Sequence, residues 1–188
     1  MKRFIFLILC FFPTALFAQS NSVVLVRQEG GSIGSGVFIS ENRVLTCYHV
    51  LSESVTNGVN LRIEYRNNIY PVEILSFSKE DDLALLKVEE VKNVEYIGIG
   101  ENLEIGDLTK TYGHPHGSWT VHSCPSILVS EDYYDCMEAN VLEGMSGGPV
   151  IKDNKLVGIV SAKSAYPKLH GYKSFNVPLR RIRAFLRR

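Results

Sequence analysis

Residues 144–149 read Gly-Met-Ser-Gly-Gly-Pro, and this short stretch carries the strongest chemical signal in the chain. A serine hydroxyl is a weak nucleophile unless a base takes its proton and backbone donors hold the oxyanion that develops. Glycine tolerates strained backbone angles, so the small neighbours let the chain turn tightly around Ser146 and let a carbonyl group come close. The N–H groups of Gly144 and Ser146 are the natural oxyanion donors. The alternative interpretation is a glycine-rich β-turn with an exposed serine.

Two segments upstream carry groups that would activate this serine. His49 stands at the end of an apolar strand candidate, and Asp82 directly precedes the apolar run Leu-Ala-Leu-Leu at residues 83–86. Taken alone, the histidine is typical of a structural residue and the aspartate of a turn or a solvated strand start. Asp82 is preferred to Asp81 because it adjoins the apolar run, and we expect Asp81 to face solvent. Together with Ser146, the order His, Asp, Ser favours a nucleophilic site.

The rest of the chain indicates an all-β architecture. Short strand-like runs separated by turn residues are typical of a barrel or sandwich. Asn67-Asn68 and Asp153-Asn154 stand where tight turns are expected, because Asn and Asp tolerate turn geometry. Apolar residues at helical spacing predict a closing helix at the C-terminus, and one helical turn is expected near His49. The predicted strands cover residues 23–26, 36–40, 43–46, 61–65, 69–77, 83–88, 108–112, 119–124, 134–141, 149–152, 156–161 and 172–177.

These segments together resemble the trypsin-like (chymotrypsin-fold) serine peptidases, most closely their bacterial HtrA-like and glutamyl-endopeptidase-like branch. The resemblance runs from about residue 22 to the end of the chain. The matching stretches are Gly-Ser-Gly-Val-Phe-Ile at 34–39, Leu-Thr-Cys-Tyr-His-Val at 45–50, Asp-Leu-Ala-Leu-Leu-Lys-Val at 82–88, Gly-His-Pro-His-Gly at 113–117, Gly-Met-Ser-Gly-Gly-Pro-Val at 144–150 and Val-Gly-Ile-Val-Ser at 157–161.

The resemblance implies two six-stranded antiparallel β-barrels packed face to face, with the site in the crevice between them and a short C-terminal helix. The first barrel would occupy residues 19–100, and the second barrel with the helix would occupy residues 101–188. Ser146 would be the nucleophile of a serine endopeptidase, His49 its general base and Asp82 the group that orients the histidine. Gly144 and Ser146 would form the oxyanion hole. The substrate would be a protein or peptide, and no metal or organic cofactor is needed.

The same family spacing locates a primary specificity pocket. Asn140 would lie at its base, with Ser161 and Lys163 along one wall. A carboxylate suited to basic side chains is absent at that base, although Glu138 is nearby. Lys163 or His170 could favour acidic side chains of the substrate; the alternative for His170 is a loop residue without this role. Pocket specificity is a difference of contacts that spacing alone does not determine.

Residues 1–18 have the pattern of a bacterial-type signal peptide, in which a basic start and a short apolar run precede a cleavage site after Ala18. The apolar run is too short to span a bilayer as a helix. Cys10 admits a lipoprotein alternative, but the large Leu9 before it disfavours lipid attachment. We therefore expect a secreted or periplasmic protein without stable membrane insertion.

The balance of basic and acidic side chains limits the classes of partner that the protein is expected to bind. The sequence has 20 basic and 20 acidic side chains, and this balance indicates no nucleic-acid binding. The basic cluster at residues 180–188 is typical of the solvated face of a docked helix; a membrane or partner site is the alternative. We expect no PDZ module after the protease-like segment, and hence a monomer rather than a cage-like oligomer.

Three cysteines remain after removal of the signal peptide: Cys47, Cys124 and Cys136. An exported protein meets an oxidising environment, where a disulfide is expected. Cys124 and Cys136 flank a turn-like stretch between two predicted antiparallel strands, so they are the preferred pair, subject to geometry. Cys47 would stay buried near the site as a small apolar side chain. The spacing of cysteines and histidines matches no zinc pattern, and no metal site is predicted.

Two other classes of protein compete with the peptidase interpretation. A non-catalytic binding module can use a protease-like fold, but such proteins usually lose a triad member or an oxyanion glycine, and this chain keeps them. An α/β-hydrolase needs a strand-to-helix elbow and the order Ser, Asp, His. Here Ser146 comes last and is followed by Pro149 and a strand.

Overall fold

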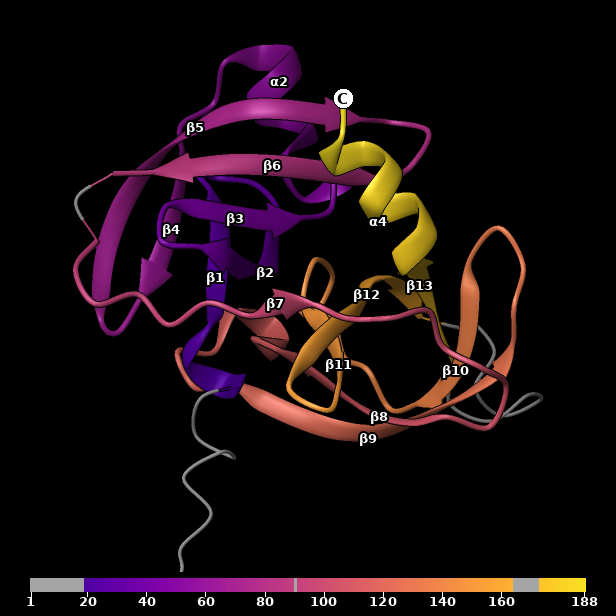
Figure 1. Ribbon diagram of the computed structural model, residues 1–188. Coiled ribbons are helices and arrows are strands. Elements are labelled where there is room, and N and C mark those ends of the chain that lie inside the picture. The colour runs from indigo at the N-terminus through magenta and orange to yellow at the C-terminus, as the bar shows by residue number, and fades with distance from the viewer. Residues whose placement is uncertain (1–18, 90, 164–172) are drawn as a thin grey trace, which may run out of the picture.

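The computed structural model describes residues 19–89, 91–163 and 173–188, and they form two β-barrels that lie one above the other in Figure 1. The predicted signal peptide at residues 1–18 and His170 lie outside the described residues. The predicted architecture of two packed six-stranded antiparallel barrels with a short C-terminal helix is confirmed.

Six strands close the first barrel in the order β1-β2-β3-β6-β5-β4. The last of them in sequence, β6, is apolar at nearly every position because it lies between β3 and β5 and contributes to the core along its length. Its amino end carries Asp82 toward the second barrel. The strands are β1 (Val23–Gln28), β2 (Ile33–Ser40), β3 (Arg43–Thr46), β4 (Leu61–Tyr65), β5 (Asn68–Ser78) and β6 (Leu83–Val88).

The second barrel follows the order β11-β8-β9-β10-β13-β12, and pairing of β11 with β12 closes it. A further short strand, β7 (Gly98–Ile99), pairs in parallel with β12; the sequence patterns did not predict it. The barrel strands are β8 (Leu108–Gly113), β9 (His122–Ser130), β10 (Asp135–Ala139), β11 (Pro149–Lys152), β12 (Lys155–Lys163) and β13 (Lys173–Pro178).

Two hairpins turn through pairs of residues with positive φ. Arg66 and Asn67, with φ of 49° and 62°, connect β4 to β5, and Asp153 and Asn154, with φ of 49° and 60°, connect β11 to β12. Two-residue turns of this hand match the twist of the flanking strands. The predicted turn at Asp153-Asn154 is confirmed, whereas the other turn lies one residue before the predicted Asn67-Asn68.

The helices are short and lie outside the barrels. A 3₁₀ turn, η1 (His49–Leu51), leads into α2 (Ser52–Asn57), and a second 3₁₀ turn, η2 (Pro115–Gly117), follows β8. The predicted closing helix is α4 (Leu179–Leu186), which buries Leu179, Ile182 and Phe185 in the same core cluster as the first barrel. Figure 1 shows α4 beside both barrels, running from the end of β13 in the lower barrel toward the upper one. None of the helices in the described part of the chain is long and apolar enough to cross a bilayer.

The predicted disulfide between Cys124 and Cys136 is wrong. Both residues lie on neighbouring antiparallel strands, as expected, but Cys136 pairs with Ser130 at the far end of β9, whereas Cys124 lies near its start. At about 3.3 Å per residue the two cysteines are about 20 Å apart along the strand, far beyond the reach of a disulfide. Cys47, Cys124 and Cys136 are all free. The error arose because β9 was predicted at residues 119–124 and extends instead over His122–Ser130.

Candidate active site

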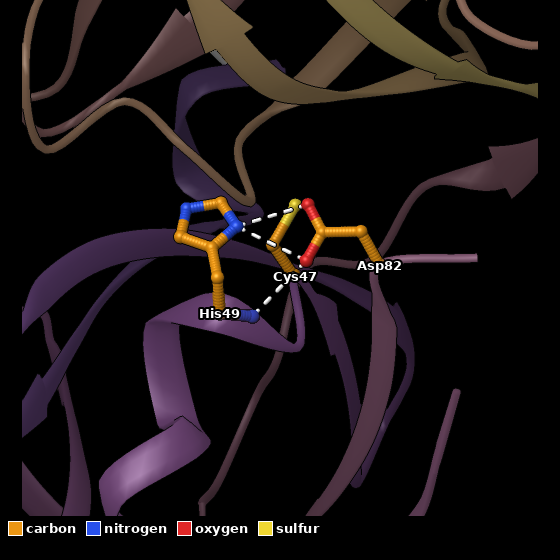
Figure 2. A group of neighbouring side chains, drawn as sticks. All are labelled: Cys47, His49 and Asp82. Carbon is orange, nitrogen blue, oxygen red and sulfur yellow. Dashed lines mark hydrogen bonds and ion pairs between the residues drawn. The ribbon is translucent and has the colours of Figure 1, made fainter. Parts of the chain in front are cut away.

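His49 lies at the point where β3 gives way to the turn η1. Its backbone N–H donates to Asp82 Oδ1 at 3.0 Å, and its Nδ1 lies 3.0 Å from Oδ1 and 2.9 Å from Oδ2 of the same carboxylate. Figure 2 shows the imidazole edge turned toward the carboxylate. The His49 side chain is 47% exposed while that of Asp82 is 13% exposed. With Nδ1–H donated to Asp82, the neutral ring keeps Nε2 as a proton acceptor.

Three donors hold the carboxylate of Asp82. Besides the two N–H groups of His49, the hydroxyl of Ser161 donates to Oδ2 at 2.6 Å. Burial alone would raise the pKa of Asp82, but the hydrogen bonds from His49, the positive charge of His49 when it is protonated, and the Ser161 hydroxyl outweigh it and lower this pKa. Asp82 is therefore an anion at neutral pH that can orient the imidazole and stabilise its charged form.

Cys47 lies next to the His49–Asp82 pair, and Figure 2 shows its sulfur beside the carboxylate. The sulfur, His49 and Asp82 each offer a potential metal-ligand atom, and these atoms lie within 4.8 Å of one another. The thiol is fully buried and donates to the carbonyl of Val160 at 3.1 Å. Burial, and then the nearby charge of Asp82, raise its pKa well above the usual value. A thiol that stays protonated is a poor metal ligand. The contacts of Cys47 therefore favour a packing role beside the His49–Asp82 pair.

Ser146 lies in a tight turn whose shape requires glycine. Gly147 has a φ of +85°, and a Cβ there would come within 2.0 Å of the Ser35 carbonyl oxygen. The Gly147 N–H donates to Val160 O at 2.7 Å, and Ser35 N–H donates to the Ser146 carbonyl at 2.7 Å. These bonds tie the serine turn of the second barrel to β2 of the first and to β12.

Ser161 is the residue that the serine and the histidine–aspartate pair share. The Ser146 hydroxyl donates to the Ser161 carbonyl at 3.1 Å, while the Ser161 hydroxyl donates to Asp82. Within the described residues no hydrogen bond joins Ser146 to His49. The two parts of the candidate site therefore meet through Ser161, and the Ser146 hydroxyl has to rotate away from that carbonyl to reach the imidazole.

The backbone beside Ser146 offers two unused donors. In the described part of the chain, the N–H groups of Gly144 and Ser146 donate to no acceptor, whereas Met145 N–H donates to Leu142 O at 3.1 Å. The Gly144 carbonyl accepts the Ser35 hydroxyl at 2.7 Å, which determines how the following peptide group is turned. Two free N–H groups next to a serine hydroxyl can hold a developing oxyanion.

Comparison with known proteins shows the family to which this chain belongs. The family model described as trypsin-like peptidase domain matches residues 34–159, which is more than half of the chain and includes His49, Asp82 and Ser146. The chain belongs to the trypsin-like peptidase family. An HtrA-like serine protease of Staphylococcus aureus is 27% identical over 197 residues, covering 90% of this chain and 25% of that protein. The chain spans between a quarter and a third of the length of the curated relatives it matches.

Solved structures share the fold at lower identity. The Rv3671c protease of M. tuberculosis in its active form superposes with a TM-score of 0.79 at 20% identity, covering 92% of this chain and 82% of that one. Deg5 superposes with a TM-score of 0.77 at 18% identity, covering 90% and 89%. These likenesses support the two-barrel trypsin-like fold.

The residues predicted to line a specificity pocket are spread over the second barrel. Asn140 is exposed just after β10, and Lys163 is exposed at the end of β12. Lys163 Nζ lies 3.1 Å from Glu143 Oε1. Ser161, predicted as a pocket wall, also contacts Asp82 and Ser146, and its sequence neighbourhood does not signal these contacts.

One prediction in this trypsin-like site is wrong, and one buried contact was not predicted. Asp81, expected to face solvent, is buried and forms ion pairs with Arg181 and Arg188 at 3.1 Å. Ser35 was recognised only as part of a matching stretch, yet it is fully buried and contacts the turn around Ser146. The Gly-Ser-Gly stretch at residues 34–36 was the available signal for Ser35, but its partners lie in the other barrel.

Proposed function

We propose that this chain is a serine endopeptidase that hydrolyses peptide bonds in proteins, with Ser146 as nucleophile, His49 as general base and Asp82 as the orienting carboxylate. The observation that carries the proposal is the Asp82 carboxylate, held by both N–H groups of His49 on one side and by Ser161 on the other. Ser161 also accepts the hydroxyl of Ser146, so all four groups lie in one continuous arrangement.

The proposed reaction begins with proton transfer from Ser146. His49 Nε2 takes the hydroxyl proton while Oγ forms a bond to the carbonyl carbon of the substrate. The carbonyl oxygen becomes an oxyanion, which the N–H groups of Gly144 and Ser146 hold. The imidazolium then gives its proton to the amide nitrogen, and the carbon–nitrogen bond breaks. The amine product departs, and the acyl group stays bound to Ser146 as an acyl-enzyme.

Water completes the cycle. His49 takes a proton from a water molecule as its oxygen attacks the acyl carbon, and a second oxyanion forms in the same hole. The ester bond to Ser146 breaks, the proton returns to Oγ and the acid product leaves. Asp82 stays ionised throughout and stabilises the imidazolium at each step, which agrees with its lowered pKa.

The proposal extends to the pocket that would bind the substrate side chain. Asn140, Ser161 and Lys163 remain the proposed pocket residues. Lys163 is paired with Glu143 at 3.1 Å, so its charge is partly satisfied, and selection of acidic side chains would require this exposed pair to open. We also propose export to the periplasm or the extracellular space, which rests on the signal-peptide pattern of residues 1–18.

Labelling by a fluorescent fluorophosphonate tests the proposal. The reagent forms a covalent bond to a serine whose proton a base removes, so the purified protein is expected to label and Ser146→Ala is not. His49→Ala is expected to lose labelling as well, while Ser32→Ala, a half-buried serine on the turn before β2, keeps it. Well-folded protein that fails to label would contradict the endopeptidase proposal. It would favour a non-catalytic binding module, in which the Ser146 hydroxyl stays on the Ser161 carbonyl.

A further inference from the structure

The turn that carries Asp82 adopts a conformation that non-glycine residues avoid. Asp82 has a φ of +51°, in the left-handed region, where aspartate is tolerated at some cost. Within the turn, its N–H donates to the Lys79 carbonyl at a long 3.3 Å. A turn of this kind persists only when its surroundings hold it, so the groups that hold residues 79–82 determine where the carboxylate of Asp82 lies.

Asp81 is the main anchor of this turn. Its carboxylate accepts the Ser78 hydroxyl at 2.7 Å and Arg181 Nε at 3.1 Å, and Arg188 Nη2 lies 3.1 Å away. Its own N–H donates to the Ser78 hydroxyl oxygen at 3.1 Å. Burial alone would raise the pKa of Asp81, but the hydrogen bonds from Ser78 and Arg181 outweigh it and lower this pKa.

Arg181 joins the turn to two distant parts of the chain. From helix α4 its Nη2 donates to the Glu80 carbonyl at 2.8 Å, so the guanidinium contacts both residues before Asp82. The same group donates to the Tyr133 carbonyl at 3.0 Å and lies 3.6 Å from the centre of the Tyr133 ring. The Tyr133 hydroxyl donates to Glu80 O at 2.7 Å. The side chains of Arg181 and Asp81 are only 12% and 11% exposed.

We infer that Arg181 is a positioning residue for the catalytic carboxylate, acting through Glu80 and Asp81 on the turn that carries Asp82. The inference rests on the proposed function, in which Asp82 orients His49. The planar guanidinium has donors on several sides, and here it uses them on Asp81, on the Glu80 carbonyl and on Tyr133 at once. It thereby links the first barrel to α4 and to the loop between β9 and β10.

A purely structural role for Arg181 would give different kinetics from a positioning role. If Arg181 served only to dock α4, its loss would lower stability and the amount of active protein, but not the turnover of each active molecule. Misplacement of Asp82 would slow the chemical step, because small errors of alignment cost much in rate. The imidazolium would also be held less well, so the acidic limb of the pH profile would move to lower pH.

The experiment compares Arg181→Ala and Arg181→Lys with wild type, using an internally quenched peptide that wild type cleaves. Active sites are counted by fluorophosphonate labelling. We expect kcat per labelled site to fall about 10- to 100-fold in Arg181→Ala, with KM within about twofold and the acidic limb of kcat/KM at lower pH. Arg181→Lys keeps the charge but not the planar set of donors, so its kcat is expected between the two. Arg187→Ala is the control and matches wild type, because Arg187 is the exposed C-cap residue directly after the same helix.

A double-mutant cycle tests the route through Asp81. Asp81→Asn is expected to reproduce the kinetic defect of Arg181→Ala, and the double variant is expected to be no slower than either, since coupled residues are non-additive. Multiplying defects would contradict action through Asp81. The inference is overturned if Arg181→Ala, or Arg181→Lys should the alanine variant not fold, keeps kcat and the pH limb of Arg187→Ala. Wild type that neither labels nor cleaves would instead overturn the proposed function.

Discussion

Ser35→Ala removes one hydroxyl that joins the two barrels at the candidate site. The side chain is fully buried. Its hydroxyl donates to the Gly144 carbonyl at 2.7 Å and accepts the backbone N–H of His114 at 2.8 Å. In the alanine variant both backbone groups lose their partner in a place that water reaches poorly, while the strand pairing of β2 is unchanged.

The expected magnitude follows from those two bonds. A buried polar group left without a partner costs about 1–3 kcal/mol, so the free energy of unfolding is expected to fall by about 2–4 kcal/mol in total. For a chain of this size that corresponds to a loss of roughly 5–15 °C in Tm. Because the Gly144 carbonyl loses its partner, the peptide group between Gly144 and Met145 becomes freer to turn, and so do the two flanking peptide groups, which carry the proposed oxyanion donors, the N–H groups of Gly144 and Ser146. Complete loss of an oxyanion donor costs about 10²–10³ in kcat, and we expect about a tenfold fall for a loosened one.

Urea unfolding followed by tryptophan fluorescence and circular dichroism measures the stability, and cleavage of a quenched peptide per labelled site measures kcat. Ser32→Ala is the matched control, because Ser32 lies in the turn just before β2 and its side chain forms no hydrogen bond with described residues. It is expected to stay within about 0.5 kcal/mol of wild type. The reasoning is refuted if Ser35→Ala does the same and keeps kcat within twofold.

Three further predictions concern other groups in the two barrels. Ser161→Ala removes the donor at 2.6 Å from Asp82; hydrogen bonds to charged groups are worth about 1.5–3 kcal/mol, so kcat is expected to fall about tenfold, and an unchanged kcat would contradict the role assigned to Ser161. Burial raises the pKa of Asp135 to about 6, above its value in the unfolded chain, so its favourable contribution is present below about pH 4 and is lost as the pH rises through 6. Asp135→Asn should therefore gain about 1–2 kcal/mol over wild type at pH 8 and little at pH 4 in urea unfolding; an equal effect at both pH values would count against this. Alkylation of denatured, non-reduced protein should modify Cys47, Cys124 and Cys136, and an intact mass lacking two hydrogens would instead indicate a disulfide.

The sequence alone predicted the features that depend on residues close together in the chain, namely the turns, the strands and the closing helix. The turn at Ser146 needs Gly147, because a Cβ would collide with the Ser35 carbonyl, and this need is visible in the sequence as a glycine-rich stretch. The turn at Asp153-Asn154 was predictable because both residues tolerate positive φ. Strand content and the closing helix followed from apolar periodicity, and the family resemblance supplied the order of the barrels.

Tertiary structure alone decided which distant side chains meet. Strand register placed Cys136 opposite Ser130 and far from Cys124, since a shift in strand bounds changes every partner while leaving the residue pattern almost unaltered. Packing of the two barrels brought Ser35 to the turn around Ser146 and Ser161 to Asp82. The docking of α4 brought Arg181 to Asp81, whose sequence neighbourhood suggested a solvated position. The sequence therefore indicated the proposed reacting groups, whereas the contacts that orient them come from segments far apart in the chain, whose meeting depends on the packing of the whole fold.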